Sequence, residues 1–478
     1  MPRKWAISMP AERRLTGRAQ FANRPSTGAH SAGQSRVRSF IAVAFVIAAL
    51  GLGGGGSSAP RSELLLQLIA ALAAAAWLVV SREPGTNRQA HQRLWIMAGV
   101  LLALPCLQLL PLPPLIWERL PGREQELAAL ELVGAGAAWM PWSITPARTF
   151  ASLLAILPAL LTMGMVAGLD REGRAWVIAA IAGMAAVSLL LGALQLSAGM
   201  AAGWRPYGIG NLGFLNGFQA NRNAQADVLL IGLVASASSL RTWSDRRQTA
   251  VDLILAALAA LLLLGCVLTG SRAGMAMIPV ALAAAAIIWL PQRIRGRAAL
   301  LGLGAVLAAG AAGFLVLRQT AAVGRSLERF ASERDFRWEL WQDTLYAIMQ
   351  YWPFGSGIGS FKSVITAAER LEVVDPTSPV RAHNDYLELT LEGGVFGLMV
   401  LSFAAVWIGW MAIDAWRRRN PATRPQIVFA FAVMTIIALH SLVDYPLRSM
   451  ALACLAGVAA GLLSAPSASR KARELTGT

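Results

Sequence analysis

Residues 261–290 read LLLLGCVLTGSRAGMAMIPVALAAAAIIWL, in which a short polar segment with one arginine, Arg272, separates two apolar runs. About 20 apolar residues in a helix cross the hydrocarbon core of a bilayer, so each run with its flanking residues is long enough to span a membrane. The same pattern recurs along the chain, since 56% of its 478 residues are apolar and 14% are charged. This composition excludes a water-soluble globule and predicts an all-α polytopic membrane protein.

Apolar windows along the chain predict about twelve transmembrane helices. The windows are residues 39–54, 64–80, 94–115, 149–169, 175–198, 223–240, 250–269, 273–291, 298–317, 393–416, 426–443 and 447–463. Arginines crowd both tails and every second connection, and the positive-inside rule assigns these segments to the cytoplasm. Orientation and contact with anionic membrane lipids then explain the net charge of +16, so we expect no nucleic acid partner.

The windows and the charge pattern divide the chain into segments. These are a basic cytoplasmic tail at 1–38, transmembrane helices 1–9 at 39–317, a long outer loop at 318–392, transmembrane helices 10–12 at 393–463, and a cytoplasmic tail at 464–478. The alternative for the first tail is a transit peptide. The loop holds more acidic than basic residues, which breaks the basic pattern. Loops of this length without a role are uncommon, so we expect function there.

Within the loop, one segment has the pattern of an amphipathic helix. Its apolar residues at helical spacing are Phe336, Leu340, Trp341, Leu345, Ile348 and Met349. We expect this helix to lie on or beside the outer leaflet and to end at Pro353.

Familiar catalytic motifs do not explain the chain. Gly208, Gly210 and Gly213 spell G-x-G-x-x-G, but no predicted strand precedes them, so a dinucleotide site is not indicated. The sequence has no Walker motif, no H-E-x-x-H and no Cys/His spacing for zinc. We expect neither a metal nor a cofactor.

Two arginines stand at the outer ends of apolar runs. Arg272 follows the first run quoted above, and Arg222 opens another in QANRNAQAD. An arginine near the hydrocarbon boundary costs a few kcal/mol unless it snorkels to the interface or binds an anion. Both interpretations stay open from spacing alone. The guanidinium fork suits a phosphate, so two such arginines indicate a diphosphate site.

One histidine lies where the outer loop re-enters the membrane. His383 has Arg381, Asn384 and Asp385 as neighbours in sequence, and histidine is the side chain best suited to accept a proton near neutral pH. A structural histidine is the alternative interpretation. His440 is predicted to be a packing or hydrogen-bonding group beside Asp444.

Arginines and a histidine on an outer face indicate a transferase with an unusual donor. Nucleotide sugars and ATP are not readily supplied outside the cytoplasm, so the donor must arrive activated and carried by the membrane. A lipid-linked pyrophosphoryl sugar fits this requirement. Two arginines would stabilise the departing diphosphate, and a histidine would deprotonate the acceptor hydroxyl.

Four segments together resemble the bacterial O-antigen ligase and polysaccharide polymerase superfamily. They are TGSRAG (269–274), RAHNDYLELTLEGGVFGL (381–398), NRNAQAD (221–227) and HSLVDYPLR (440–448), and the resemblance covers about residues 145–463. It implies a multi-pass bacterial inner-membrane glycosyltransferase of the GT-C type that is independent of metals. The implied donor is a glycan on undecaprenyl diphosphate, used at the periplasmic face. The implied acceptor is lipid A-core or a growing polysaccharide.

The resemblance also implies roles for individual residues. Arg222 and Arg272 are expected to bind the donor diphosphate, and His383 is expected to activate the acceptor hydroxyl. The residues expected to contact substrate are Arg381, Arg337, Arg334 and Asn384. The long loop at 318–392 then lies in the periplasm, and direct attack by the acceptor on the anomeric carbon would invert its configuration.

The motifs leave two activities of the superfamily open. Ligation of a finished O-antigen to lipid A-core and polymerisation of repeat units use the same donor type and differ in the acceptor. We favour a ligase, because the long loop lies late in the chain and carries the histidine. A lipid or polysaccharide transporter is the alternative from another class. Transporters tend to place ionisable groups near the bilayer midplane, whereas the candidates here gather at one boundary.

Overall fold

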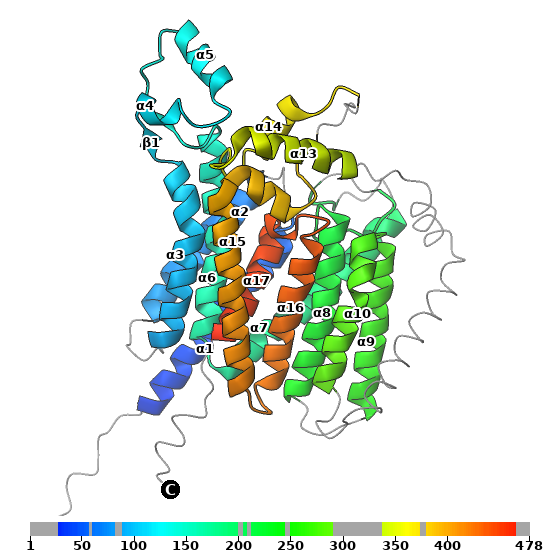
Figure 1. Cartoon of the computed structure of the whole chain (residues 1–478). Helices are drawn as coiled ribbons and strands as arrows, with labels where there is room; N and C mark the ends of the chain where they lie inside the picture. Colours follow the sequence, from blue (N-terminus) through cyan, green and yellow to red (C-terminus); the bar gives the residue numbers. More distant parts are fainter. Residues whose placement is uncertain are drawn as a thin grey trace, which may run out of the picture.

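The computed structural model describes residues 27–56, 60–81, 88–198, 204–207, 212–243, 249–289, 337–372 and 379–464. Long helices dominate this part of the chain and form a bundle that shorter helices cover at one end (Figure 1). The long helices are α1 (Thr27–Leu52), α2 (Pro60–Val80), α3 (Arg88–Gln108), α6 (Pro146–Gly168), α7 (Arg171–Ala198), α8 (Arg222–Trp243), α9 (Thr249–Leu268), α10 (Arg272–Trp289), α15 (Asp385–Arg418), α16 (Arg424–His440) and α17 (Met450–Ser464).

The bundle confirms the prediction of a polytopic all-α membrane protein. Eight of the described helices are long and apolar enough to cross a membrane, and the segments Gln92–Gln108, Arg424–His440 and Met450–Ser464 are shorter apolar helices. Every predicted window except 298–317 falls on one of these helices. The window 298–317 lies outside the described residues.

Helix α8 occupies the centre of the bundle, because nearly all of its side chains from Asn223 to Ser239 are buried. Small residues allow its neighbours to approach closely. Gly232 of α8 faces Ala185 of α7, and Gly274 of α10 faces Ala226 of α8, so that a β-carbon at either glycine would collide with the alanine. The contact at Gly274 brings the first turns of α8 and α10 together.

Helix α15 begins earlier than predicted. Its first residue is Asp385, whereas hydropathy indicated a start at 393. The side chain of Asn384 caps it by accepting hydrogen bonds from the backbone N–H groups of Tyr386 (3.0 Å) and Leu387 (3.1 Å). The helix kinks at Gly394, whose φ of 56° suits glycine and whose position leaves no room for a β-carbon beside the backbone of Pro353. The predicted boundary thus coincides with the kink.

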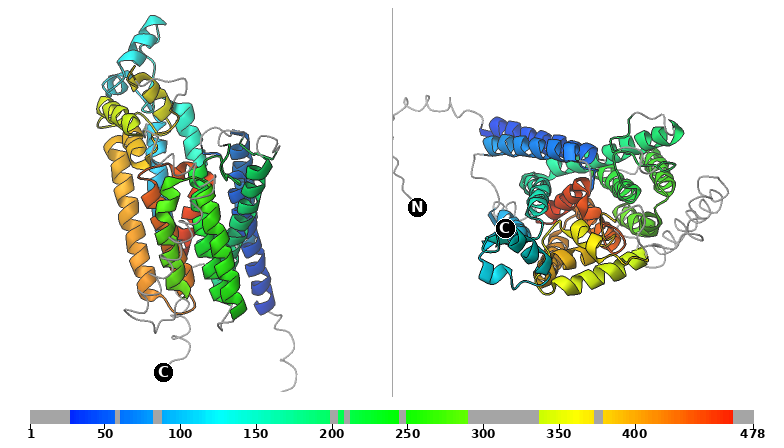
Figure 2. Two further views of the ribbon diagram at one scale, coloured as in Figure 1. Left: turned by 90° about the vertical axis from the view of Figure 1, so that its right-hand side faces the viewer. Right: turned by 90° about the horizontal axis from the view of Figure 1, so that it is seen from above.

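The amphipathic segment forms α13 (Arg337–Tyr351), which lies across the end of the bundle, as the view from above shows (Figure 2). The prediction of a helix that stops before Pro353 is confirmed. Leu345 is 50% and Met349 is 69% exposed, and the position of this helix on the outer leaflet stays a prediction. Phe336 lies outside the described residues. The side chains that α13 buries are Leu340, Asp343, Thr344 and Ala347.

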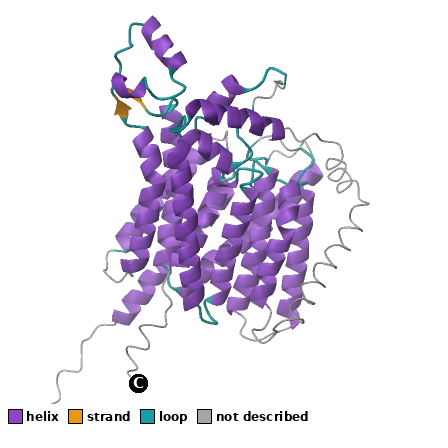
Figure 3. Cartoon of the chain, in the orientation of Figure 1, coloured by secondary structure: helices purple, strands orange, loops and turns teal. Residues whose placement is uncertain are grey.

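Other short elements lie at the same end of the bundle. Residues 109–145 project from it and contain the only strands of the described chain, β1 (Pro111–Leu112) paired antiparallel with β2 (Met140–Pro141), together with the helices α4 (Pro114–Trp117) and α5 (Glu124–Leu132) (Figure 3). Helix α14 (Phe361–Ala368) packs beside α13, and the 3-10 helix η2 (Pro446–Arg448) joins α16 to α17.

Candidate active site

The first residues of α8, α10, α13 and α15 meet at the end of the bundle that α13 and α14 cover (Figure 1). The turn between α16 and α17 lies at this end too, because Asn221, just before α8, donates a hydrogen bond to Asp444 in that turn. The arginine-rich chain segments beside Arg171, Arg241, Arg418 and Arg424 lie at the opposite end. The structure therefore gathers the predicted site residues at one end of the bundle.

His383 is held by a carboxylate. Its Nδ1 lies 2.9 Å from Oδ1 of Asp444, and its ring meets the ring of Tyr445 edge-on at a centroid distance of 5.0 Å. The backbone of His383 has a φ of 51°, a left-handed conformation that residues other than glycine seldom adopt and that is often found at functional sites. The side chain remains 21% exposed. The imidazole is thus oriented and still accessible.

Asp444 is buried, and its two oxygens have different partners. Oδ1 faces His383, and Oδ2 accepts a hydrogen bond from Nδ2 of Asn221 at 2.9 Å. Burial alone would raise the pKa of Asp444, but the hydrogen bond with His383 and nearby positive charge, including that of Arg337, hold the pKa below its ordinary 3.8. An ionised Asp444 keeps a proton on Nδ1 of His383, which makes Nε2 the nitrogen that can accept a proton.

The predicted arginines begin helices around this pair. Arg222 is the first residue of α8, and its guanidinium carbon lies 4.4 Å from the ring centroid of Phe214. Arg272 is the first residue of α10, where the hydroxyl of Ser271 accepts a hydrogen bond from the backbone N–H of Gly274 at 3.0 Å. Because the first turns of α8 and α10 touch, the two arginines lie on adjoining helix N-termini. Such termini carry partial positive charge and favour anions.

Arg337, the first residue of α13, completes the group. Its positive charge acts on both Asp444 and His440, so it lies close to the His383–Asp444 pair. We call the group made by His383, Asp444, Asn221, Arg222, Arg272 and Arg337 the His383 site.

A second histidine–aspartate pair lies within the bundle beside the first. Nδ1 of His440 is 2.6 Å from Oδ1 of Asp227, with the side chains 1% and 0% exposed. His440 is a hydrogen-bonding group, as predicted, but its partner is Asp227 and not Asp444.

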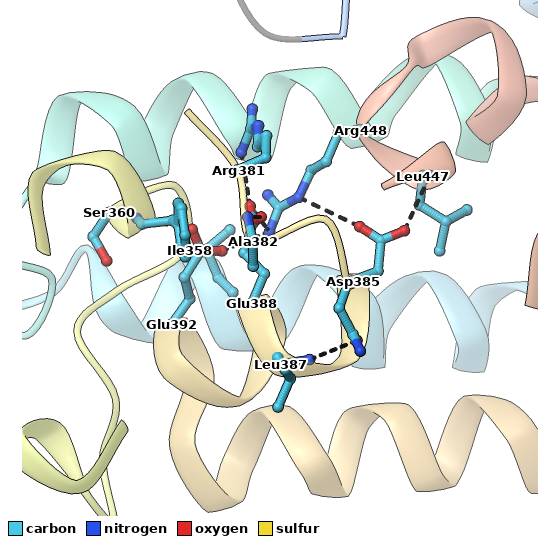
Figure 4. A network of polar contacts seen from close by, with 12 residues as sticks. Ile358, Ser360, Arg381, Ala382, Asp385, Leu387, Glu388, Glu392, Leu447 and Arg448 are labelled. Atoms are coloured by element: carbon cyan, nitrogen blue, oxygen red, sulfur yellow. Dashed lines mark hydrogen bonds and ion pairs between the residues drawn. The ribbon is translucent and has the colours of Figure 1, made fainter. Parts of the chain in front are cut away.

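Three carboxylates of α15 and two arginines form another cluster at this end (Figure 4). Nη2 of Arg448 is 2.7 Å from Glu392 and 3.0 Å from Glu388, and its Nε is 4.0 Å from Asp385. Nη1 of Arg381 donates to Glu388 at 2.9 Å. Burial lowers the pKa of Arg448, but the carboxylates outweigh burial and raise it above its ordinary value. We call this cluster the Arg448 network.

The remaining predicted contacts are distributed as follows. Arg381 belongs to the Arg448 network through Glu388, and Asn384 caps α15 while its Nδ2 donates to the carbonyl oxygen of Leu442 at 3.0 Å. Arg334 lies outside the described residues. The protein thus already occupies part of the hydrogen-bonding capacity of Arg381 and Asn384.

Sequence reasoning missed several residues that shape this end. The contact of Asp444 with His383 was not predicted, and Asn221 and Arg448 were not recognised. A signal for Arg448 did exist, because Asp385, Glu388 and Glu392 share one helical face at the entrance of an apolar helix. Buried carboxylates need a cation, and DYPLR at 444–448 supplies one.

The fold and the site define a polytopic helical membrane protein with an oriented histidine and several arginines at one end of the bundle. The model of the family described as O-antigen ligase matches residues 257–402, from within α9 to within α15. This match supports membership of the chain in the O-antigen ligase family, and it includes two of the four motif segments, 269–274 and 381–398. The matched segment includes Arg272, Arg337 and His383. No curated protein matches the chain.

Proposed function

We propose that the protein transfers a glycan from undecaprenyl diphosphate to an acceptor hydroxyl at the periplasmic face of the bacterial inner membrane, and that the reaction is ligation of O-antigen to lipid A-core. The observation that carries the proposal is the 2.9 Å contact between His383 Nδ1 and Asp444 Oδ1 beside the arginine-bearing first turns of α8 and α10. The family match supports an activity of the O-antigen ligase or polymerase type.

The proposed orientation follows from the charge of the two ends. Connections with Arg171, Arg241, Arg417 and Arg424 favour the cytoplasmic side, which assigns the opposite end, with the His383 site, to the periplasm. In this arrangement both termini are cytoplasmic, the chain crosses the membrane about twelve times, the loop at 318–392 is periplasmic, and the architecture is of the GT-C type.

The proposed reaction is a direct displacement. The acceptor oxygen forms a bond to the anomeric carbon as the bond from that carbon to the diphosphate oxygen breaks. The proton of the acceptor hydroxyl passes to Nε2 of His383. Undecaprenyl diphosphate leaves with the electron pair, and Arg222 and Arg272 stabilise its charge. Asp444 stabilises the imidazolium that forms, a role that carboxylates have beside other catalytic histidines. The configuration at the anomeric carbon inverts, and no metal is required.

The other proposed substrate contacts differ in their support. Arg337 is included because it begins α13 at the same end of the bundle and its charge acts on Asp444. Arg381 and Asn384 have protein partners and would contribute through their remaining hydrogen-bonding groups. Arg334 is retained from the motif resemblance alone.

Reconstitution tests the proposal. Purified protein in vesicles receives a donor linked to undecaprenyl diphosphate and a lipid A-core acceptor, with no nucleotide and with a chelator present. We expect glycan on the acceptor, and about a 10²- to 10⁴-fold lower rate for His383→Ala, the range for losing a general base. Lys362→Ala, an exposed change on α14, is the control. Carrier translocation without glycan transfer would instead support the transporter.

A deletion strain separates ligation from polymerisation. If the protein is a ligase, its loss leaves polymer on the carrier lipid and removes polymer from lipid A. If it is a polymerase, its loss leaves products with a single repeat unit. Carrier-lipid and lipopolysaccharide profiles of the same strain measure both outcomes.

A further inference from the structure

The second histidine–aspartate pair is not used in the proposed reaction. His440 ends α16 and Asp227 lies in α8, and their contact of 2.6 Å is almost completely buried. Ionisable side chains inside a membrane bundle are costly and usually have a functional reason. A buried pair that served only to join two helices could be replaced by apolar side chains with little loss or with a gain in stability.

The pair is also incompletely satisfied. Oδ2 of Asp227 and Nε2 of His440 are buried and have no hydrogen-bond partner within the described residues. Buried polar groups in proteins are nearly always hydrogen-bonded, and an exception calls for an explanation other than stability. The position of the pair offers one.

His440 and Asp227 connect the two chain segments that carry much of the His383 site, the start of α8 and the turn between α16 and α17. Asp227 is on the helix that begins with Arg222, about one and a half turns further along. His440 is directly followed by the turn that carries Asp444, and the backbone N–H of Asp444 donates to the carbonyl oxygen of His440 at 2.9 Å. The hydrogen bond from Asn221 to Asp444, at 2.9 Å, connects the same two segments closer to the end of the bundle.

We infer that His440 and Asp227 are positioning residues, which fix the arginine of the proposed donor site on α8 relative to the Asp444–His383 pair that activates the acceptor. The inference rests on the proposed function and extends it to residues that touch neither substrate. The charge of His440 also acts on Asp444, which couples the two pairs electrostatically.

The inference predicts a particular kinetic effect. The reacting atoms must meet at about 3 to 3.5 Å, and a displacement of about 1 Å can cost on the order of 10²-fold in rate. Loss of the contact between Asp227 and His440 would change the distance between the glycan donor and His383. The groups that bind each substrate would still be present. Loss should therefore appear in kcat and not in the KM for either substrate.

Asp227→Leu and His440→Leu are the principal variants. Asp227→Leu removes the acceptor of the hydrogen bond, and we expect kcat to fall about 10- to 100-fold with the donor KM unchanged. His440→Leu should show the same loss. In His440→Asn the amide N–H₂ can replace Nδ1 as the donor to Asp227, so part of the rate should return.

Two further variants separate positioning from folding. Gln426→Leu removes a buried link at the other end of α16, where Nε2 donates to the carbonyl oxygen of Arg171 at 2.9 Å. It should lower the melting temperature and leave kcat per folded molecule unchanged. The double variant Asp227→Leu with His440→Leu removes both polar groups, so we expect it to fold and still to be slow.

The outcomes are distinct from those that test the function itself. Wild-type protein that transfers no glycan refutes the proposed function. Wild-type protein that transfers glycan, while folded Asp227→Leu or the double variant keeps the wild-type kcat, overturns the positioning role. A rise in the donor KM with unchanged kcat overturns it as well, because that result would make the pair part of the binding site.

Discussion

The Arg448 network and the His383 site both lie at the beginning of α15, and they differ in their charged groups. In the network, Glu388 and Glu392 are completely buried and bonded to arginines of the protein. In the site, the imidazole of His383 stays 21% exposed, although its partner Asp444 is buried. The side chains of Arg381 and Arg448 are themselves 19% and 17% exposed, so both clusters pair buried carboxylates with a partly exposed basic group.

The two clusters also differ in the charged groups that they bring together. The network pairs Asp385, Glu388 and Glu392 with Arg381 and Arg448, whereas the described part of the His383 site brings Arg222, Arg272 and Arg337 near Asp444. We propose that the second arrangement, and not the first, attracts a diphosphate. Two groups of buried charge a few residues apart can therefore have different tasks, the network fixing the loop and the site binding an anion.

Arg448→Met is the strongest test of this difference. It leaves three carboxylates buried with one arginine, and removal of one partner from a buried ion pair costs about 3 to 5 kcal/mol of stability. Denaturant unfolding in detergent should show this loss, while the protein that remains folded should transfer glycan at the wild-type rate. Arg448→Lys should recover part of the stability. If Arg448→Met is stable and inactive instead, the network belongs to the active site.

Asp444→Asn should have the reverse effect. The amide no longer stabilises an imidazolium, and it allows the wrong tautomer of His383, so we expect a loss of rate on the order of 10²-fold or more, with most of the stability kept. The initial rate of transfer measures it. The matched control is Asp343→Asn on α13, a buried carboxylate 2.6 Å from Arg370 and outside the site. It should lower stability and spare the rate, and equal rate losses in the two variants would contradict the assignment.

Arg272→Lys tests whether binding of the donor diphosphate needs the planar shape of the guanidinium as well as its charge. Lysine retains the charge but not the planar fork that contacts two phosphate oxygens at once, so we expect about a tenfold lower kcat/KM for the donor, less than the loss for alanine. Arg370→Lys, outside the site, is the control. Full activity of Arg272→Lys would show that charge alone suffices and would leave Arg272 as an interfacial arginine.

The sequence predicted the helices of the bundle well, because hydropathy measures the lipid-facing surface that most of them share. The prediction was less accurate for helix segments that contact other parts of the protein instead of lipid. The start of α15 was missed, since Glu388 and Glu392 lower its hydropathy although both are buried against Arg448. Within α13 the sequence likewise did not indicate that Asp343 is buried with Arg370 as its partner.

The sequence indicated candidate site residues better than it indicated their hydrogen-bond partners. Arg222, Arg272 and His383 were singled out as candidates because arginine and histidine are conspicuous at membrane boundaries. The partner of His383 was not predicted, because Asp444 lies 61 residues from His383 in the chain and only four from His440. Only tertiary packing decides which imidazole reaches the carboxylate.

The smallest effect concerns the dependence of stability on pH. The pKa of Asp444 is held below 3.8, so its ionised form stabilises the folded protein above that pH, and this stabilisation is lost as the pH falls through the lower pKa of the folded state. Asp444→Asn lacks this contribution. The difference in melting temperature between the wild type and Asp444→Asn should therefore be larger at about pH 5 than at about pH 3. A difference that is no larger at about pH 5 than at about pH 3 would mean that burial dominates and that Asp444 is not the anion that orients His383.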